Sequence, residues 1–340
     1  MRVADFDYDL PADRIAQEAI EPRDASRLLV LPGPEDRRFR DLPDLLHAGD
    51  LLVVNRTRVR PARLHGHRDG TGGKVELLLT KHLAGPDWEA LVRPARRMRP
   101  GVRIKCRSLD AVVTGDPADG VVPVRIEPRN STTVEEAIMA SGEVPLPPYF
   151  HGPLPDPERY QTMFAAGSGS AAAPTAGLHF TPGLVRALAD RGIAITEVEL
   201  DVGLDTFRPM SGETVADHTM HRERFRVPAE AARAVGRARQ EGGRVVAVGT
   251  TTVRTLEAAA AADGGVRPGE AETGLFITPG YRFRVVDALI TNFHAPRTSL
   301  IALVAAFAGP QWRAAYRHAL EAGYRFLSFG DAMFIGARHD

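Results

Sequence analysis

The feature that most constrains the fold is a block of short β-like segments that interrupts a longer pattern of alternating strands and helices. Six short runs lie between Pro61 and Arg129, separated by turns rich in glycine, proline and aspartate, at 62–67, 74–81, 88–93, 102–106, 110–114 and 121–126. A helix at 132–141, capped by Thr132 or Thr133, follows them. Regular short strands with turn signals and no intervening helix are typical of a small antiparallel barrel or sandwich.

The chain on either side of this block has the pattern of an α/β layer. A buried strand at 51–54 precedes the block, and a Pro-rich linker at 144–150 follows it. Helices and strands then alternate, at 182–191 (helix), 193–202 (strand), 229–240 (helix), 244–248 (strand), 253–262 (helix), 285–291 (strand) and 300–308 (helix). Such alternation implies a partly parallel sheet covered by helices. We therefore predict a mixed α/β fold, with an α/β domain at 1–60 and 149–340 and an inserted β-barrel domain at 61–148.

Composition excludes several classes of protein. The single cysteine, Cys106, rules out an internal disulfide and a Cys-rich metal cluster, and we expect it to be a structural thiol. The N-terminus lacks the apolar run of a signal peptide, and the most apolar window, 300–308, is too short to cross a membrane. We therefore expect a cytoplasmic protein with no membrane partner. We also expect it to be a monomer. Equal numbers of acidic and basic residues, 43 each, argue against indiscriminate nucleic-acid binding but allow a local basic patch.

The common catalytic and cofactor motifs are absent from the sequence. It contains no G-x-G-x-x-G, no P-loop, no H-E-x-x-H and no G-x-S-x-G. His218 and His221 are spaced so that both could face one metal ion, but no further ligand clusters with them. We expect no metal site and no bound cofactor.

Polar residues concentrate in loops near the ends of the predicted strands, which is where ligands bind in α/β sheets. One such loop carries Thr175 and His179 just before a helix, and His179 is a group that ordinarily titrates near neutral pH. The alternative is a loop whose histidine only satisfies a helix cap. Another loop joins a strand to three hydroxyls at a helix start, Thr250, Thr251 and Thr252, where free N–H groups favour an anion such as a carboxylate.

Two further loops complete this set. Asn292, Phe293 and His294 suit a purine or a sulfonium, because the face of the aromatic ring attracts a cation; the alternative is that Phe293 is a core residue. In the loop that follows 193–202, Arg208 could clamp a carboxylate, and Asp201 or Asp205 could meet a cation or a ribose diol. The alternative for Arg208, Asp201 and Asp205 is that they form structural ion pairs.

Basic residues cluster in and beside the inserted block. They fall in two stretches, Arg56, Arg58, Arg60, Arg63 and Arg68, and then Arg93, Arg96, Arg97, Arg99, Arg103, Lys105 and Arg107. If they share a face, they form a phosphate-binding footprint despite the zero net charge. The alternative is solvated charge in an arginine-rich composition.

Read together and in order, these loops resemble the S-adenosylmethionine:tRNA ribosyltransferase-isomerase family of queuosine biosynthesis. The matching segments cover nearly the whole chain and include 57–59, 61–64, 73–76, 145–149, 160–162, 173–181, 206–209, 249–251, 291–294 and 330–333. The resemblance implies an α/β domain with an inserted β-barrel. It also implies S-adenosylmethionine as a substrate rather than a cofactor, and the anticodon region of tRNA as the acceptor.

The reaction that the resemblance implies needs acid–base groups and anion anchors. The ribosyl group would pass to 7-aminomethyl-7-deazaguanine at the wobble position, giving epoxyqueuosine and releasing adenine and methionine. A base would take a proton from the ribose 5′ carbon, the ring would open with loss of adenine, the substrate amine would attack, and epoxide closure would expel methionine. The candidates are His179, His294 and His221 for proton transfer, Thr250 and Thr251 with Arg254 or Arg208 for the methionine carboxylate, and Arg58, Arg63 and Arg97 for tRNA.

Three positions depart from the family pattern, which usually has Asn at Arg56, His at Asp201 and Gly at Asp205. The loss of a histidine removes a titratable partner, and a Cβ at position 205 strains a turn. Two alternatives therefore stay open. The chain could transfer the ribosyl group to a small-molecule amine, or it could bind tRNA without catalysing any reaction.

Overall fold

The computed structural model describes residues 1–118, 120–130, 133–152, 154, 156–167, 169–203 and 208–339. The chain divides into two compact units. Unit 1 comprises residues 1–58, 148–167 and 173–340, and unit 2 comprises 59–147 and 168–172. Within the described residues, no helix is long and apolar enough to span a membrane.

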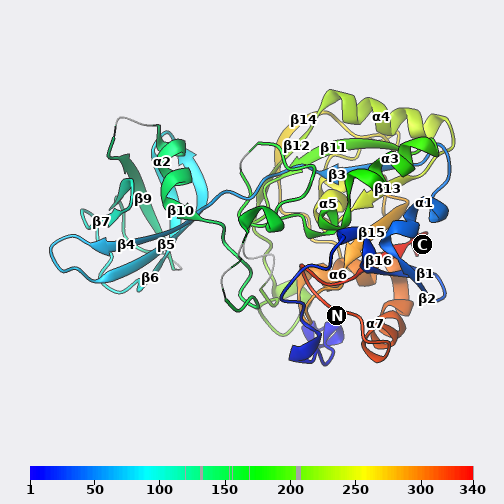
Figure 1. Ribbon diagram of the computed structural model, residues 1–340, viewed down its shortest axis with the longest axis horizontal. Helices are drawn as coiled ribbons and strands as arrows, with labels where there is room; N and C mark the ends of the chain where they lie inside the picture. The colour runs from blue at the N-terminus through cyan, green and yellow to red at the C-terminus, as the bar shows by residue number, and fades with distance from the viewer. Residues whose placement is uncertain are drawn as a thin grey trace. The chain divides into compact units, whose positions relative to one another are not determined.

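Unit 1 is built on a large mixed sheet (Figure 1). Its strands lie in the order β14 (Gly269–Thr273), β12 (Glu223–Val227), β11 (Ala194–Leu200), β3 (Leu51–Asn55), β13 (Val245–Val248), β15 (Ala288–Asn292), β16 (Ala332–Ile335), β1 (Arg27–Leu31) and β2 (Glu35–Arg38). The four central strands β11, β3, β13 and β15 are mutually parallel, so their carboxyl ends meet at one edge. β3, β13 and β15 are buried at every position, which explains why they read as continuous apolar runs.

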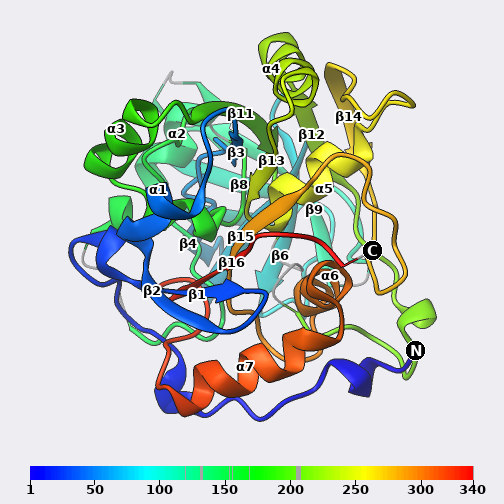
Figure 2. The same cartoon turned by 90° about the vertical axis from the view of Figure 1, so that its right-hand side faces the viewer.

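Helices cover both faces of the central strands (Figure 2). They are α1 (Leu42–Leu45), α3 (Pro182–Asp190), α4 (Ala229–Gln240), α5 (Thr250–Ala258), α6 (Ser299–Ala308) and α7 (Trp312–Glu321). On one face, Leu184 and Leu188 of α3 pack against Leu52 of β3 and Val246 of β13 in one buried cluster. α4 and α5 contact β11, β3 and β13 from the other side.

Unit 2 contains a closed antiparallel β-barrel. Its strands are β4 (Arg63–Arg68), β5 (Lys74–Ala84), β6 (Asp87–Arg93), β9 (Val121–Pro128), β8 (Leu109–Val113) and β7 (Arg103–Cys106), and β7 pairs back onto β4. A Cβ on Gly66 would lie 2.7 Å from the carbonyl oxygen of Lys105, so this closure requires glycine at that point. Helix α2 (Val134–Ser141) and the short strand β10 (Gly142–Glu143) complete the unit.

The predicted mixed α/β fold with an antiparallel barrel is confirmed. Cys106 is buried in the barrel core, and burial raises the pKa of its thiol to about 11. Thr133 caps α2, whereas Thr132 lies outside the described residues. Several elements have no counterpart in the prediction, namely β1, β2, β12, β14, β16 and α7. Helix α5 begins at Thr250 rather than at residue 253, so its threonines form the first turn.

Candidate functional site

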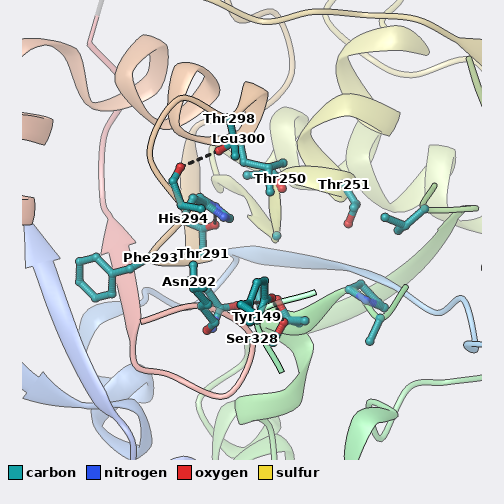
Figure 3. A pocket seen from close by; sticks show the side chains of 18 residues that line it. Tyr149, Thr250, Thr251, Thr291, Asn292, Phe293, His294, Thr298, Leu300 and Ser328 are labelled. Atoms are coloured by element: carbon teal, nitrogen blue, oxygen red, sulfur yellow. Dashed lines mark hydrogen bonds between the residues drawn. The ribbon is translucent and has the colours of Figure 1, made fainter. Parts of the chain in front are cut away.

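A cavity lies at the carboxyl ends of the parallel strands of unit 1 (Figure 3). Its volume is about 40 Å³, within about 600 Å³ of empty space that includes its open mouth. Three of the four loops predicted from the sequence meet here, and Val202, directly before the remaining loop, also lines the cavity. The lining residues are Tyr149, Ala173, Pro174, Thr175, Ala176, Val202, Gly249, Thr250, Thr251, Thr291, Asn292, Phe293, His294, Ala295, Thr298, Leu300, Leu327 and Ser328.

The N-terminus of α5 opens into this cavity. Gly249 is the N-cap, with φ of 92°, and its N–H donates to the carbonyl of Ile290 at 2.7 Å. No side chain caps the helix, so N–H groups of its first turn are left without intrahelical partners. The Thr252 hydroxyl donates back to the carbonyl of Val248 at 2.7 Å. The Thr251 hydroxyl lines the cavity, is buried and has no hydrogen-bond partner among the described residues. The free N–H groups of the first turn and the Thr251 hydroxyl are donors of the kind that favour an anion.

His294 presents its imidazole to the same cavity. Its Nε2 lies 2.8 Å from the Thr291 hydroxyl. The backbone on either side is held by two tyrosines, because Tyr8 donates to the His294 carbonyl at 2.5 Å and the His294 N–H donates to the Tyr316 hydroxyl at 3.1 Å. Nδ1 has no hydrogen-bond partner within the part of the chain that is described. When Nε2 carries the proton, Nδ1 is a lone pair available to accept one.

His179 does not line this cavity and is fully engaged behind it. Its Nδ1 lies 2.8 Å from the Ser26 hydroxyl, and its Nε2 accepts from the amide of Asn292 at 3.1 Å. The oxygen of that amide accepts from the Thr175 hydroxyl at 3.0 Å. His179 also stacks on Phe39, with ring centroids 4.8 Å apart. The residue therefore orients Asn292 and Thr175 rather than offering a free nitrogen to a ligand.

Burial changes the ionisation of both histidines. It lowers the pKa of His294 to about 3, and it lowers the pKa of His179 to about 3 with further contributions from Arg23 and Arg325. The expectation that His179 titrates near neutral pH is therefore wrong. Both imidazoles are neutral at pH 7.

These shifts predict a loss of stability in acid. An unfolded histidine has a pKa of about 6.5, so the unfolded chain binds protons that the folded chain cannot. The contribution of the two neutral histidines to the free energy of unfolding is fully present above about pH 6.5, and it is lost as the pH falls from about 6.5 toward 3. At pH 5 the loss is roughly 2 kcal/mol for each histidine. Urea denaturation at pH 7.5 and pH 5 should show His294→Gln losing about 2 kcal/mol less than the wild type; an equal loss in both would contradict this assignment.

Phe293 does not offer its ring to a ligand. Figure 3 shows the ring directed away from the cavity. It packs against Tyr316, Tyr324 and Phe326, with centroid separations of 5.3, 5.5 and 4.8 Å, and is fully buried. Phe293 is therefore a core residue, and the prediction that its ring attracts a cation is wrong.

Arg254 is placed apart from the cavity lining. Its guanidinium forms a buried ion pair with Glu223, and its Nε donates to the carbonyl of Leu275 at 3.1 Å. The arginine and its partner are only 4% and 7% exposed. Arg254 therefore makes a structural ion pair and does not contact a carboxylate ligand in this cavity.

Two other predicted residues lie outside the cavity lining. Arg208 and His221 are both exposed and are absent from that set. His218, near His221, has a pKa lowered by burial and by the charge of that neighbour.

Asp205 lies outside the described residues, and the backbone N–H of Asp201 donates to the carbonyl of Arg224 at 2.9 Å. Among the described residues, no group of three or more metal-ligating side chains gathers.

The arginines predicted to bind tRNA have different surroundings. Arg58 forms an ion pair with Glu158 in unit 1. In unit 2, Arg63 is half-buried with an unpartnered Nε, and Arg97 lies exposed in the loop after β6. Arg56, where the family usually has asparagine, is held by Glu199 at 2.6 Å and by Glu197 at 3.4 Å.

The sequence analysis did not predict several cavity residues as site residues, among them Tyr149 and Ser328. The Tyr149 hydroxyl lies 2.5 Å from that of Ser328, and both line the cavity. Tyr149 lies in the Pro-rich segment at 144–150 that was interpreted as a linker. Ser328 follows Leu327, whose φ of 68° is unusual for a bulky residue. The family-like segments at 145–149 and 330–333 were the available signal, because they adjoin these two positions.

Comparison with known proteins gives matches that cover nearly the whole chain. Residues 3–335 match the family described as queuosine biosynthesis protein. Two relatives are 53% and 52% identical to this chain, each over 98% of this chain and 100% of the relative. They are the S-adenosylmethionine:tRNA ribosyltransferase-isomerases from Symbiobacterium thermophilum and Moorella thermoacetica, respectively. The crystal structure of S-adenosylmethionine tRNA ribosyltransferase from Thermotoga maritima has a TM-score of 0.55 and 39% identity, over 97% of this chain and 99% of that one.

Proposed function

Because the chain belongs to the queuosine biosynthesis protein family, we propose that it transfers and isomerises the ribosyl part of S-adenosylmethionine onto tRNA. The acceptor is 7-aminomethyl-7-deazaguanine in the anticodon region, and the products are epoxyqueuosine, adenine and methionine. S-adenosylmethionine is a substrate, and the reaction takes no other cofactor. The enzyme acts as a monomer in the cytoplasm.

One observation carries this proposal, namely that an anion site and a neutral imidazole line the same cavity. The first turn of α5 supplies N–H donors and the hydroxyls of Thr250 and Thr251 for the methionine carboxylate. His294 supplies a lone pair for the proton of the ribose 5′ carbon, which the adjacent sulfonium acidifies. Small-molecule sites measure about 300–1,000 Å³, so the substrate would extend from the enclosed part into the open mouth.

The test is release of adenine. Purified protein is incubated with S-adenosylmethionine and a tRNA carrying the deazaguanine, and free adenine is followed by chromatography. Adenine formation that requires the modified tRNA supports the proposal. Release with the free deazaguanine alone would favour the small-molecule amine as acceptor. Tight tRNA binding without adenine release would favour a catalytically inactive tRNA-binding protein.

Replacement of Thr251 by valine tests the carboxylate site. Valine keeps the shape of threonine but removes the unpartnered hydroxyl, so we expect folding stability to be unchanged or slightly higher. We expect the KM for S-adenosylmethionine to rise by roughly tenfold, since a hydrogen bond to a charged group contributes about 1.5–3 kcal/mol. Steady-state kinetics of adenine release measure this change.

Thr252→Val is the matched control for that substitution. Its hydroxyl is bonded to the carbonyl of Val248 and is fully buried, so its loss should affect stability but not the KM. Equal KM values for Thr251→Val and the wild type would remove this hydroxyl from the carboxylate site.

A further inference from the structure

A second hollow lies on the barrel and is lined by cations. Its volume is about 340 Å³, and it is formed within unit 2 by the hairpin between β4 and β5 and by the loop after β6. No carboxylate is among its lining residues, which are Arg68, Thr71, Gly73, Lys74, Val75, Pro94, Arg96 and Arg97. Four positive charges around one concave surface attract an anion.

Several other cations on the barrel are paired with carboxylates. Arg103 is paired with Asp110 and Glu127 at 3.1 and 2.6 Å, and Arg125 is paired with Asp87 at 2.8 Å. Arg129 pairs with Asp110, and Lys105 pairs with Asp69. These residues belong to the same barrel but carry compensated charge, so they contribute little to a field that reaches an external ligand.

The cations of the hollow form no ion pair with any of the described residues. This holds for Arg68, Lys74, Arg96 and Arg97, and the Nε of Arg68 is also buried without a partner. A buried guanidinium nitrogen without a hydrogen bond is rare in folded proteins, because its desolvation costs free energy that only a bound partner offsets. Arg68, Lys74, Arg96 and Arg97 therefore differ from the paired residues of the barrel, and they line one concave surface together.

The backbone that carries these charges is anchored. Met98 is 1% exposed and belongs to the barrel core, so it holds the loop that carries Arg96 and Arg97. Arg68 donates to the carbonyl of Arg96 at 3.2 Å and ties the hairpin to the loop. Arg97 has a φ of 71°, a left-handed conformation that a side chain occupies at a cost. Anchored donors lose less conformational entropy when they bind an anion.

We propose that this hollow binds the phosphodiester backbone of the tRNA substrate. The inference rests on the proposed function, and it assigns tRNA affinity to Arg68, Lys74, Arg96 and Arg97 of the barrel and the chemistry to the cavity of unit 1. Guanidinium groups suit phosphate because they donate two parallel hydrogen bonds to its oxygens. The Thr71 hydroxyl adds a further donor.

The experiment compares two double variants of the full-length protein. Arg96→Ala/Arg97→Gly removes two unpaired charges, and glycine at position 97 relieves the left-handed backbone, so the fold should be retained. Arg125→Ala/Arg129→Ala removes two paired charges from the same barrel and changes the net charge equally. Binding of a fluorescently labelled tRNA is measured by anisotropy at several salt concentrations, and circular dichroism verifies that both variants are folded.

We expect the first variant to raise the Kd for tRNA by at least roughly tenfold, because two charge-assisted contacts are lost. The slope of log K against log salt should fall by about 0.7–0.9 for each lost contact. Adenine release at saturating tRNA, and the KM for S-adenosylmethionine, should stay unchanged. The second variant should show little change in affinity or slope.

Two results would overturn the inference, namely an unchanged Kd for tRNA in the first variant and an equal loss of affinity in both variants. In the first case, calorimetry with inorganic pyrophosphate follows, and a loss of pyrophosphate binding in that variant would make the hollow a site for a small anion. Because the readout is binding, absence of adenine release would overturn the proposed function alone.

Discussion

Replacement of His294 by alanine is expected to slow adenine release by about 10²–10⁴-fold, the usual contribution of a positioned acid–base group. The imidazole lines the cavity, and its Nδ1 has no partner within the described residues. The Kd for S-adenosylmethionine should change little, because the carboxylate site at α5 is left intact. Single-turnover kinetics and calorimetry measure the two quantities separately.

The pH profile distinguishes a proton acceptor from a structural role. A base works in its neutral form, so kcat/KM should fall only when pH drops through its pKa. Burial lowers the pKa of His294 to about 3, which places the acid limb well below the ordinary value of 6.5. An acid limb near pH 6.5 that persists in His294→Ala, or a kcat within threefold of wild type, would assign the proton transfer to another group.

Replacement of Glu223 by alanine is expected to lower the free energy of unfolding of unit 1 by about 3–5 kcal/mol. The substitution leaves the guanidinium of Arg254 buried without its carboxylate. A buried charge that has lost its partner is far costlier than the pair itself is stabilising. Urea denaturation monitored by circular dichroism measures the effect.

Glu272→Ala is the matched control, since Glu272 of β14 pairs with Arg222, directly before β12, but is exposed. Its loss should cost less than about 1 kcal/mol. The double variant Glu223→Leu/Arg254→Met should recover much of the stability and still bind S-adenosylmethionine. Loss of that binding in a folded double variant would return Arg254 to the carboxylate site.

The barrel and the parallel strands were predictable because their signals are local. The sequence shows a near-alternation of polar and apolar residues along β6, which becomes alternate burial in the barrel, and turn residues between the short runs. Both patterns can be recognised without knowing any distant contact. The convergence of the loops at 173–176, 249–251 and 291–295 was also predictable, since the carboxyl ends of parallel strands share one edge. Strands such as β1 and β16 were not predicted, because they are short and acquire their role by pairing with each other across the chain.

The direction of each side chain was not predictable. Phe293 and His294 are neighbours in the sequence, yet the ring of one enters the aromatic core and the ring of the other enters the cavity. Thr251 and Thr252 differ in the same way, since one hydroxyl faces the cavity and the other returns to the backbone. Which residue of such a pair serves the ligand depends on the surface packed against it.

The sequence by itself determined the fold class, the barrel and the loops that carry the chemistry, because periodicity and turn residues act over a few positions. Only the tertiary structure decided that Arg254 pairs with Glu223 and that His179 orients Asn292 from behind the cavity. Burial and charge pairing depend on residues that are distant in the chain, and the same burial makes both histidines neutral.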